Sequence, residues 1–117
     1  FMAVPKEGPS AGVTLVTGIV SALRGIPIRN DLAMTGEITI MGKVLEVGGI
    51  QEKIRVAVEN GIKEVIIPEG NLKEAHLLPP SILSAVKITP VSSIEQVIEK
   101  AFVSKEKGKG PIIEDND

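Results

Sequence analysis

Ser10 is the first residue in the chain whose position could support covalent chemistry. It lies in the loop GPSAG, residues 8–12, directly before an apolar stretch that begins at Val13. A serine at the start of a helix is often a plain N-cap, so a purely structural role is one interpretation. The same position also lies beside free N–H groups and the positive end of the helix dipole, which stabilise an oxyanion. Ser10 is therefore a candidate nucleophile, and it would need a base to accept its proton.

Lys53 is the candidate base. It belongs to a stretch whose apolar residues recur at the spacing of one helix face, namely Ile50, Ile54, Ala57 and Val58. Lys53 occupies the i+3 position of that stripe, and burial there would disfavour a charged ammonium, so that the neutral amine could accept a proton. The alternative is that the side chain runs along the edge of the stripe and keeps its ammonium in water. The only histidine, His76, lies in a predicted loop beside the Pro79-Pro80 break.

The elements that must position these residues follow from periodicity and turn signals. Helices are expected at residues 13–24, 50–60, 71–78 and 92–102, with Asn71 capping the third and a Ser92/Glu95 capping box opening the last. Strands are expected at residues 32–40, 43–47, 64–67 and 87–91, with a hairpin turn at Met41-Gly42. Residues 4–12 are expected to form a loop, and residues 13–24 a buried helix. This order predicts an α/β (α+β) domain in which helices cover a layered mixed sheet.

Composition narrows the class of protein. The 117 residues suffice for one domain, which we place at residues 1–103, followed by a charged, glycine-rich tail at 104–117 that we expect to be disordered. A net charge of −2 and 2% aromatic residues indicate no nucleic-acid surface. Because the chain has no cysteine, a thiol nucleophile and a disulfide framework are excluded. No apolar run is long enough for a membrane span.

Three segments carry a resemblance to a known family. PKEGPSAG (5–12), AMTGEITIMGKVLEVGGIQEK (33–53) and NGIKEVIIPEGN (60–71) resemble, in order and spacing, the proteolytic domain of Lon proteases. In that family the serine of the PSAG motif is the nucleophile and the lysine of the GG-x-x-E-K segment is its partner. The resemblance therefore assigns these roles to Ser10 and Lys53, and it places Thr35 of the AMTGE motif beside the lysine. Glu7 matches a position that is most often Asp in the family.

The resemblance also implies a function for the whole protein. It implies an ATP-dependent serine endopeptidase that cleaves unfolded or damaged proteins and assembles as a homo-oligomer, a hexameric ring. It implies no cofactor or metal in this chain, because ATP and Mg are used by an ATPase module outside these residues. Family domains begin upstream of the PSAG motif, so a Lon-type fold lacking its first strands is expected. The implied location is the cytoplasm, with a mitochondrial or peroxisomal matrix as the alternative.

Two other functions compete with the protease. A small-molecule kinase would use the same loop and helix start to bind phosphate. Against it, GPSAG contains a proline, and residues 36–43 have five residues between their glycines where a Walker A loop has four, with Val44 after the lysine. The other alternative is a truncated, non-catalytic interaction fragment of the same fold, although both Ser10 and Lys53 are present.

Overall fold

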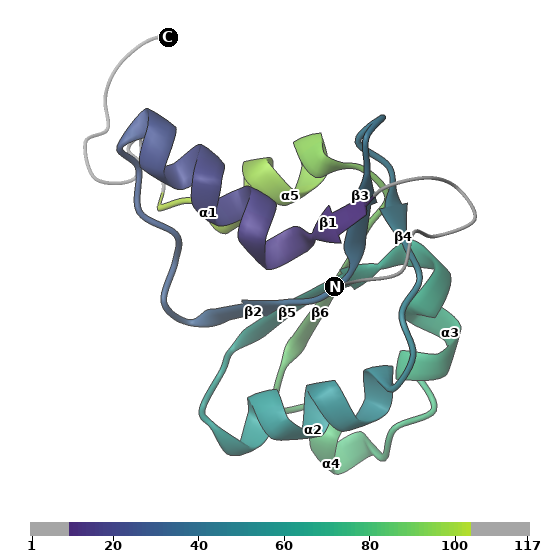
Figure 1. The fold of residues 1–117 in the computed structure, drawn as a ribbon. Coiled ribbons are helices and arrows are strands. Elements are labelled where there is room, and N and C mark those ends of the chain that lie inside the picture. Colours follow the sequence, from purple (N-terminus) through teal and green to yellow (C-terminus); the bar gives the residue numbers. More distant parts are fainter. Residues whose placement is uncertain (1–9, 104–117) are drawn as a thin grey trace, which may run out of the picture.

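A computed structural model describes residues 10–103, with Ser10 and Ala11 described by their backbone alone. The chain forms two small sheets flanked by helices (Figure 1). The strands of this part are β1 (Ser10–Gly12), β2 (Leu32–Met34), β3 (Glu37–Thr39), β4 (Val44–Leu45), β5 (Glu64–Pro68) and β6 (Lys87–Val91). Its helices are α1 (Val13–Arg24), α2 (Ile50–Glu59), the 3-10 helix η1 (Glu69–Asn71), α3 (Leu72–Ala75), α4 (Pro80–Leu83) and α5 (Ile94–Ala101).

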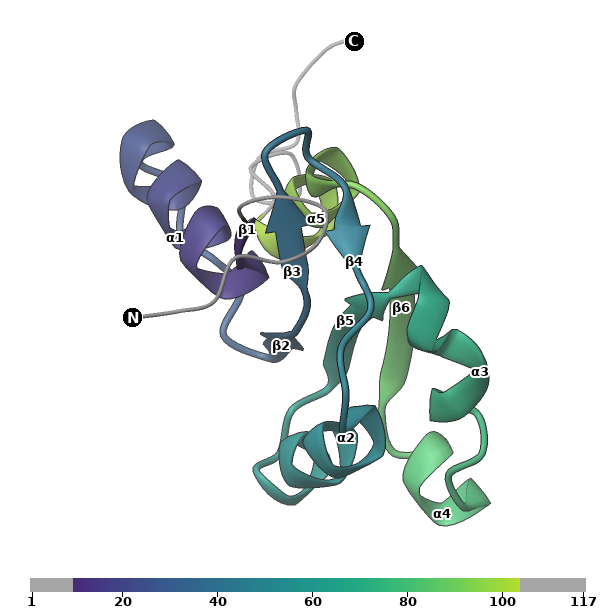
Figure 2. The ribbon, with the colours of Figure 1, turned by 45° about the vertical axis from the view of Figure 1, so that its right-hand side comes forward.

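A parallel sheet with the order β2-β5-β6 forms the middle layer. Every residue of β5 is buried, as expected for a central parallel strand that is covered on both faces. Val65 and Ile67 pack in one core with α2, whereas Ile66 packs in a second core with Val13 of α1 and Val97 of α5. Both views show α1 and α5 on one face of this sheet and α2 on the other (Figures 1 and 2).

An antiparallel sheet with the order β1-β3-β4 lies beside the first. The predicted hairpin is confirmed, and Gly42 adopts φ +88° in its turn. The predicted combination of sheet and helices is confirmed, but the expected mixed sheet is divided into a parallel and an antiparallel sheet, because the expected strand 32–40 is interrupted after Met34. Gly36 there has φ +134°, a conformation that side chains rarely adopt, and the chain leaves the parallel sheet to enter the antiparallel one.

Helix α1 has the predicted limits and ends at Gly25, which adopts the left-handed conformation (φ +67°). It is not the buried helix that its composition predicted. Its buried residues are Val13 and Thr17, whereas three large apolar side chains spaced four residues apart are exposed. These are Leu15, Ile19 and Leu23, at 61%, 52% and 82% exposure. One face of α1 therefore presents largely exposed apolar side chains.

The remaining differences are local. The expected helix 71–78 ends at Ala75, and a further helix, α4, begins at Pro80, because proline is tolerated in the first helical turn. Helix α5 begins one residue later than the predicted capping box, since the Ser93 side chain accepts the cap hydrogen bond from the Gln96 N–H. The predicted strands 64–67 and 87–91 and the helix 50–60 are confirmed to within one residue. No helix among residues 10–103 combines the length and apolar character needed to cross a bilayer.

Candidate active site

Ser10 begins β1 and lies three residues before the first residue of α1. Its backbone pairs with Thr39 of β3, so the segment that was predicted as a loop is a strand at residues 10–12. The N-cap position of α1 is held by Gly12, which has no side chain, and not by Ser10, which was the structural alternative for this residue. Glu7 and the rest of the predicted loop lie outside the described residues.

The start of α1 is held by the segment that contains Thr35. The Val13 N–H donates to the Gly36 carbonyl over 2.9 Å, and the Thr14 hydroxyl donates to the Met34 carbonyl over 3.4 Å. On the other side, the Thr35 N–H donates to the Ile66 carbonyl of β5 over 3.1 Å. Thr35 itself is half-buried between β2 and β3. This segment thus links the first turn of α1, which follows Ser10, to the central strand.

Lys53 lies on α2, and the prediction that it is buried is wrong, because its side chain is exposed. At 3.6 residues per turn, Lys53 lies roughly 60° around the helix from Ile50, on the side away from Ile54, so it is at the edge of the buried stripe. The Lys53 ammonium donates to the Gly48 carbonyl over 3.1 Å. The described hydrogen bond of Lys53 is therefore to the loop that precedes α2 rather than to Thr35.

The two candidate catalytic residues come from different layers. The helix that follows Ser10 and the helix that carries Lys53 cover opposite faces of the parallel sheet (Figures 1 and 2). The Ser10 hydroxyl lies outside the described side chains, so its hydrogen bond with Lys53 stays a prediction. His76, the other residue that could act as a base, is exposed at the end of α3.

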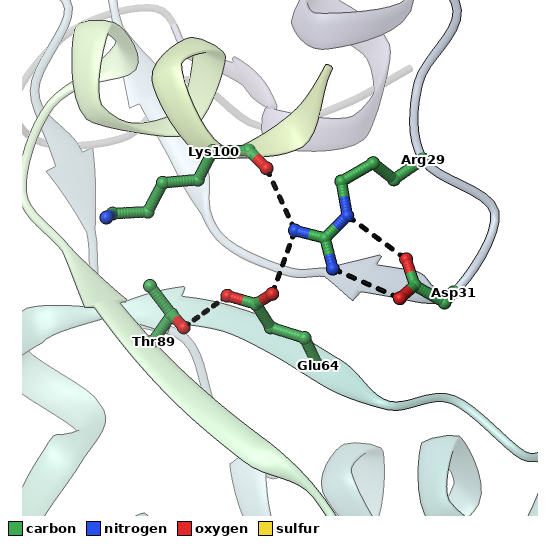
Figure 3. A network of polar contacts seen from close by, with 5 residues as sticks. All are labelled: Arg29, Asp31, Glu64, Thr89 and Lys100. Atoms are coloured by element: carbon green, nitrogen blue, oxygen red, sulfur yellow. Dashed lines mark hydrogen bonds and ion pairs between the residues drawn. The ribbon is translucent and has the colours of Figure 1, made fainter. Parts of the chain in front are cut away.

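A polar network around Glu64, the first residue of β5, was not predicted from the sequence. The Arg29 guanidinium forms two hydrogen bonds with Asp31, of 3.1 and 3.2 Å, and an ion pair of 2.8 Å with Glu64 (Figure 3). It also donates to the Lys100 carbonyl over 3.2 Å, and the Thr89 hydroxyl donates to Glu64 over 2.5 Å. The one sequence feature that could have indicated this network is Glu64, a carboxylate at the first position of an otherwise apolar strand. A cavity of about 570 Å³ is lined by four of these residues, Arg29, Asp31, Glu64 and Lys100, together with Lys87, Glu99 and Phe102.

The charges in this network are mutually satisfied. Burial acts to raise the pKa of Glu64, but the Thr89 hydroxyl, Arg29 and Lys87 together outweigh it, and the pKa is lowered. The hydrogen bonds from Arg29 also lower the pKa of Asp31, while that pair raises the pKa of Arg29. The network links the segment before β2 to β5 and α5, and β5 to β6, so we assign it a structural role.

Asn71 occupies the N-cap position of α3, as expected, but its side chain makes no capping hydrogen bond to that helix. Its buried amide instead bonds to the backbone of Val47, across 24 residues of sequence. Within residues 10–103 no group of three or more histidine or acidic side chains is arranged to hold a metal ion.

Comparison with known proteins identifies the family. Residues 2–104 match the Lon protease (S16) C-terminal proteolytic domain. The Lon protease of Rickettsia bellii is 52% identical over 103 residues, which are 88% of this chain and 13% of that protein. Those of Azorhizobium caulinodans and Fervidobacterium nodosum are each 50% identical, over 86% and 92% of this chain and 12% and 14% of those proteins.

The share of its relatives' length that this chain spans shows which part of a Lon protease it corresponds to. It spans about one eighth of the curated relatives that it matches, and the matched part is their proteolytic domain without the ATPase module. The match includes the PSAG serine segment, the AMTGE segment and the lysine on α2. This chain therefore belongs to the Lon protease family, as part of its C-terminal proteolytic domain.

Proposed function

We propose that this chain carries the catalytic residues of a serine endopeptidase, with Ser10 as the nucleophile and Lys53 as the base. The observation that carries the proposal is the continuous match to the Lon proteolytic domain over residues 2–104, which includes both residues in their family motifs. One feature of the fold supports it: Ser10 lies three residues before the start of α1, where backbone N–H groups are free of helical partners.

The chemistry follows from these two side chains. Lys53, as the base, takes the proton of Ser10 as the serine oxygen attacks the carbonyl carbon of the peptide. Charge then develops on the carbonyl oxygen, where N–H groups at the start of α1 and its dipole would stabilise it. The protonated lysine gives its proton to the leaving amine, and water releases the acyl group from Ser10. Thr35 and Glu7 are proposed as supporting residues.

Because the chain spans 12–14% of its relatives, the activity of the whole protein is also a proposal. We propose that it degrades unfolded or damaged proteins, using ATP and Mg at a module outside these residues. The assembly proposed is a homo-oligomeric ring in the cytoplasm. Segments outside the described residues would complete the substrate cleft and bring Ser10 and Lys53 together.

The test uses a chimera, because catalysis is proposed to need more than this chain. Residues 2–104 replace the matched segment of the Rickettsia bellii Lon protease, and hydrolysis of a fluorogenic peptide and of an unfolded protein is measured with ATP. Ser10→Ala and Lys53→Ala are each expected to lower kcat by at least about 1,000-fold, because a nucleophile and its base act as a unit. Ser81→Ala and Lys73→Ala, at exposed positions, serve as matched controls.

The outcomes separate the competing functions. Labelling of Ser10 by a serine-directed phosphonate in the chimera, lost in Lys53→Ala, supports the protease. Substantial peptidase activity in Lys53→Ala would contradict the dyad. An inactive chimera that assembles normally would instead support the non-catalytic fragment.

A further inference from the structure

The Asn71 side chain forms an unusual contact for a residue at a helix start. It is 3% exposed, and its amide makes two hydrogen bonds to one backbone residue. The Val47 N–H donates to Asn71 Oδ1 over 2.9 Å, and Asn71 Nδ2 donates to the Val47 carbonyl over 2.8 Å. Donating to and accepting from a single residue is the pattern that two backbone residues form in a hydrogen-bonded pair of antiparallel strands. The side chain therefore replaces a missing strand partner.

The segment that it binds needs such a partner. Strand β4 ends at Leu45, and residues 46–49 then cross to α2 without belonging to a sheet. The neighbouring residues also fit closely, because a Cβ at Gly70 would collide with the Glu46 side chain. A side chain at position 70 would require the exposed Glu46 side chain to move. Asn71 thus fixes the path of the chain between β4 and α2.

The last residues of this segment bind Lys53. The residue after Val47 is Gly48, whose carbonyl accepts the 3.1 Å hydrogen bond from the Lys53 ammonium. Next comes Gly49, which has φ +69° and whose carbonyl accepts from the Lys53 N–H over 3.2 Å. The backbone that Asn71 holds is therefore continuous with both groups that bind Lys53.

We propose that Asn71 is a positioning residue for Lys53: by holding Val47, it sets the Gly48-Gly49 carbonyls that orient the lysine. This inference rests on the proposed role of Lys53 as the base. Loss of the Asn71 amide lets the segment 46–49 shift, and small displacements of a catalytic group lower the rate steeply. Substrate binding changes little, because Asn71 itself is buried away from solvent.

The experiment measures kcat and KM for peptide hydrolysis in the same chimera. Asn71→Ala removes both bonds to Val47, and Asn71→Asp keeps the acceptor for the Val47 N–H but removes the donor. Asn71→Ala is expected to lower kcat about 10–100-fold with KM changed less than about twofold, and Asn71→Asp at least as much, because its carboxylate would face the Val47 carbonyl and the Glu74 carboxylate. The labelling rate of Ser10 by a phosphonate should fall in parallel, since that reaction also needs the base but no turnover.

Gln51→Ala is the matched control. Gln51 Nε2 donates to the Glu74 carbonyl over 2.9 Å, so it joins α2 to α3 through a side-chain amide, and its described side-chain hydrogen bond is not to the segment 46–49. This variant should keep kcat within about twofold of the parent while lowering the melting temperature to a similar degree.

Each outcome decides the inference. A folded Asn71→Ala chimera with unchanged kcat overturns it, as does an equal loss of kcat in Gln51→Ala. If Asn71→Ala does not fold, Asn71→Asp decides in the same way. Full activity of Lys53→Ala would instead reject the proposed function, whatever the Asn71 variants show.

Discussion

Replacing Arg29 by methionine is the sharpest test of the physical interpretation of this fold. Methionine keeps most of the apolar length of arginine but removes every donor. Glu64, whose side chain is 8% exposed, would then keep only the Thr89 hydroxyl as a hydrogen-bond partner within residues 10–103. The Lys100 carbonyl at the end of α5 would also lose its described side-chain donor.

The size of the effect follows from burial. Removing one partner of a fully buried ion pair costs about 3–5 kcal/mol of unfolding free energy. The Arg29 side chain is 29% exposed, so water screens this pair and can reach Glu64 once arginine is gone. We therefore expect a loss of about 2 kcal/mol at pH 7, discounted for this exposure. For a domain of this size that lowers the melting temperature by about 10 °C.

The loss should depend on pH in a defined direction. The pKa of Glu64 is lowered in the folded chain, so its charged form adds stability above the unfolded value of about 4.3, and this stability disappears as pH falls through the lower folded pKa. In Arg29→Met, only Thr89 and Lys87 still lower the pKa of Glu64 against the raising effect of burial, so this pKa should rise. The deficit of the variant should therefore be largest above about pH 5 and shrink in more acidic solution, where a protonated Glu64 needs no cation.

Urea unfolding of the 117-residue chain at pH 7 and pH 4 measures both effects. Arg55→Met, at an exposed position on α2, is the control and should change the free energy of unfolding by less than about 0.5 kcal/mol. A deficit at Arg29 no larger than that of the control, or one that grows toward pH 4, would refute the reasoning.

Two further predictions concern the packing around α1. The Thr17 hydroxyl is fully buried and has no hydrogen-bond partner among the described residues, so Thr17→Val should stabilise the chain by about 1 kcal/mol, seen as a higher melting temperature; a lower one would show that the hydroxyl is satisfied. A Cβ at Gly36 would lie 3.2–3.3 Å from Pro68, Val44 and Val13 at a φ of +134°, so Gly36→Ala should destabilise by at least about 1 kcal/mol in urea unfolding. Gly25→Ala, where the added Cβ meets open space, separates backbone strain from crowding.

The sequence predicted most elements because their signals are local. Apolar periodicity and the glycine after Arg24 determine the limits of α1, and the run that starts at Glu64 determines β5. The break between β2 and β3 escaped prediction because it depends on a close approach of Gly36 to three other segments. Pro80 was interpreted as an ending although it begins α4, because proline suits both positions.

The candidate site was predictable in its residues but not in its arrangement. Ser10 and Lys53 were recognised from motif and chemistry, yet the exposure of Lys53 depends on how far its position lies from the centre of the buried stripe. The contacts of Asn71 and Arg29 connect residues far apart in the chain. Such pairings arise from tertiary packing, which periodicity does not encode.

The exposed face of α1 makes local stability uneven along this helix. Its first turn is anchored by Val13, which is 1% exposed and bonded to Gly36. Toward Arg24, side chains such as Leu23 are already largely in water, so unwinding these turns exposes little additional apolar surface and costs little free energy. In an isolated chain, fraying should therefore start at the end of α1 distant from Ser10. The turn next to the proposed nucleophile should open only together with the core.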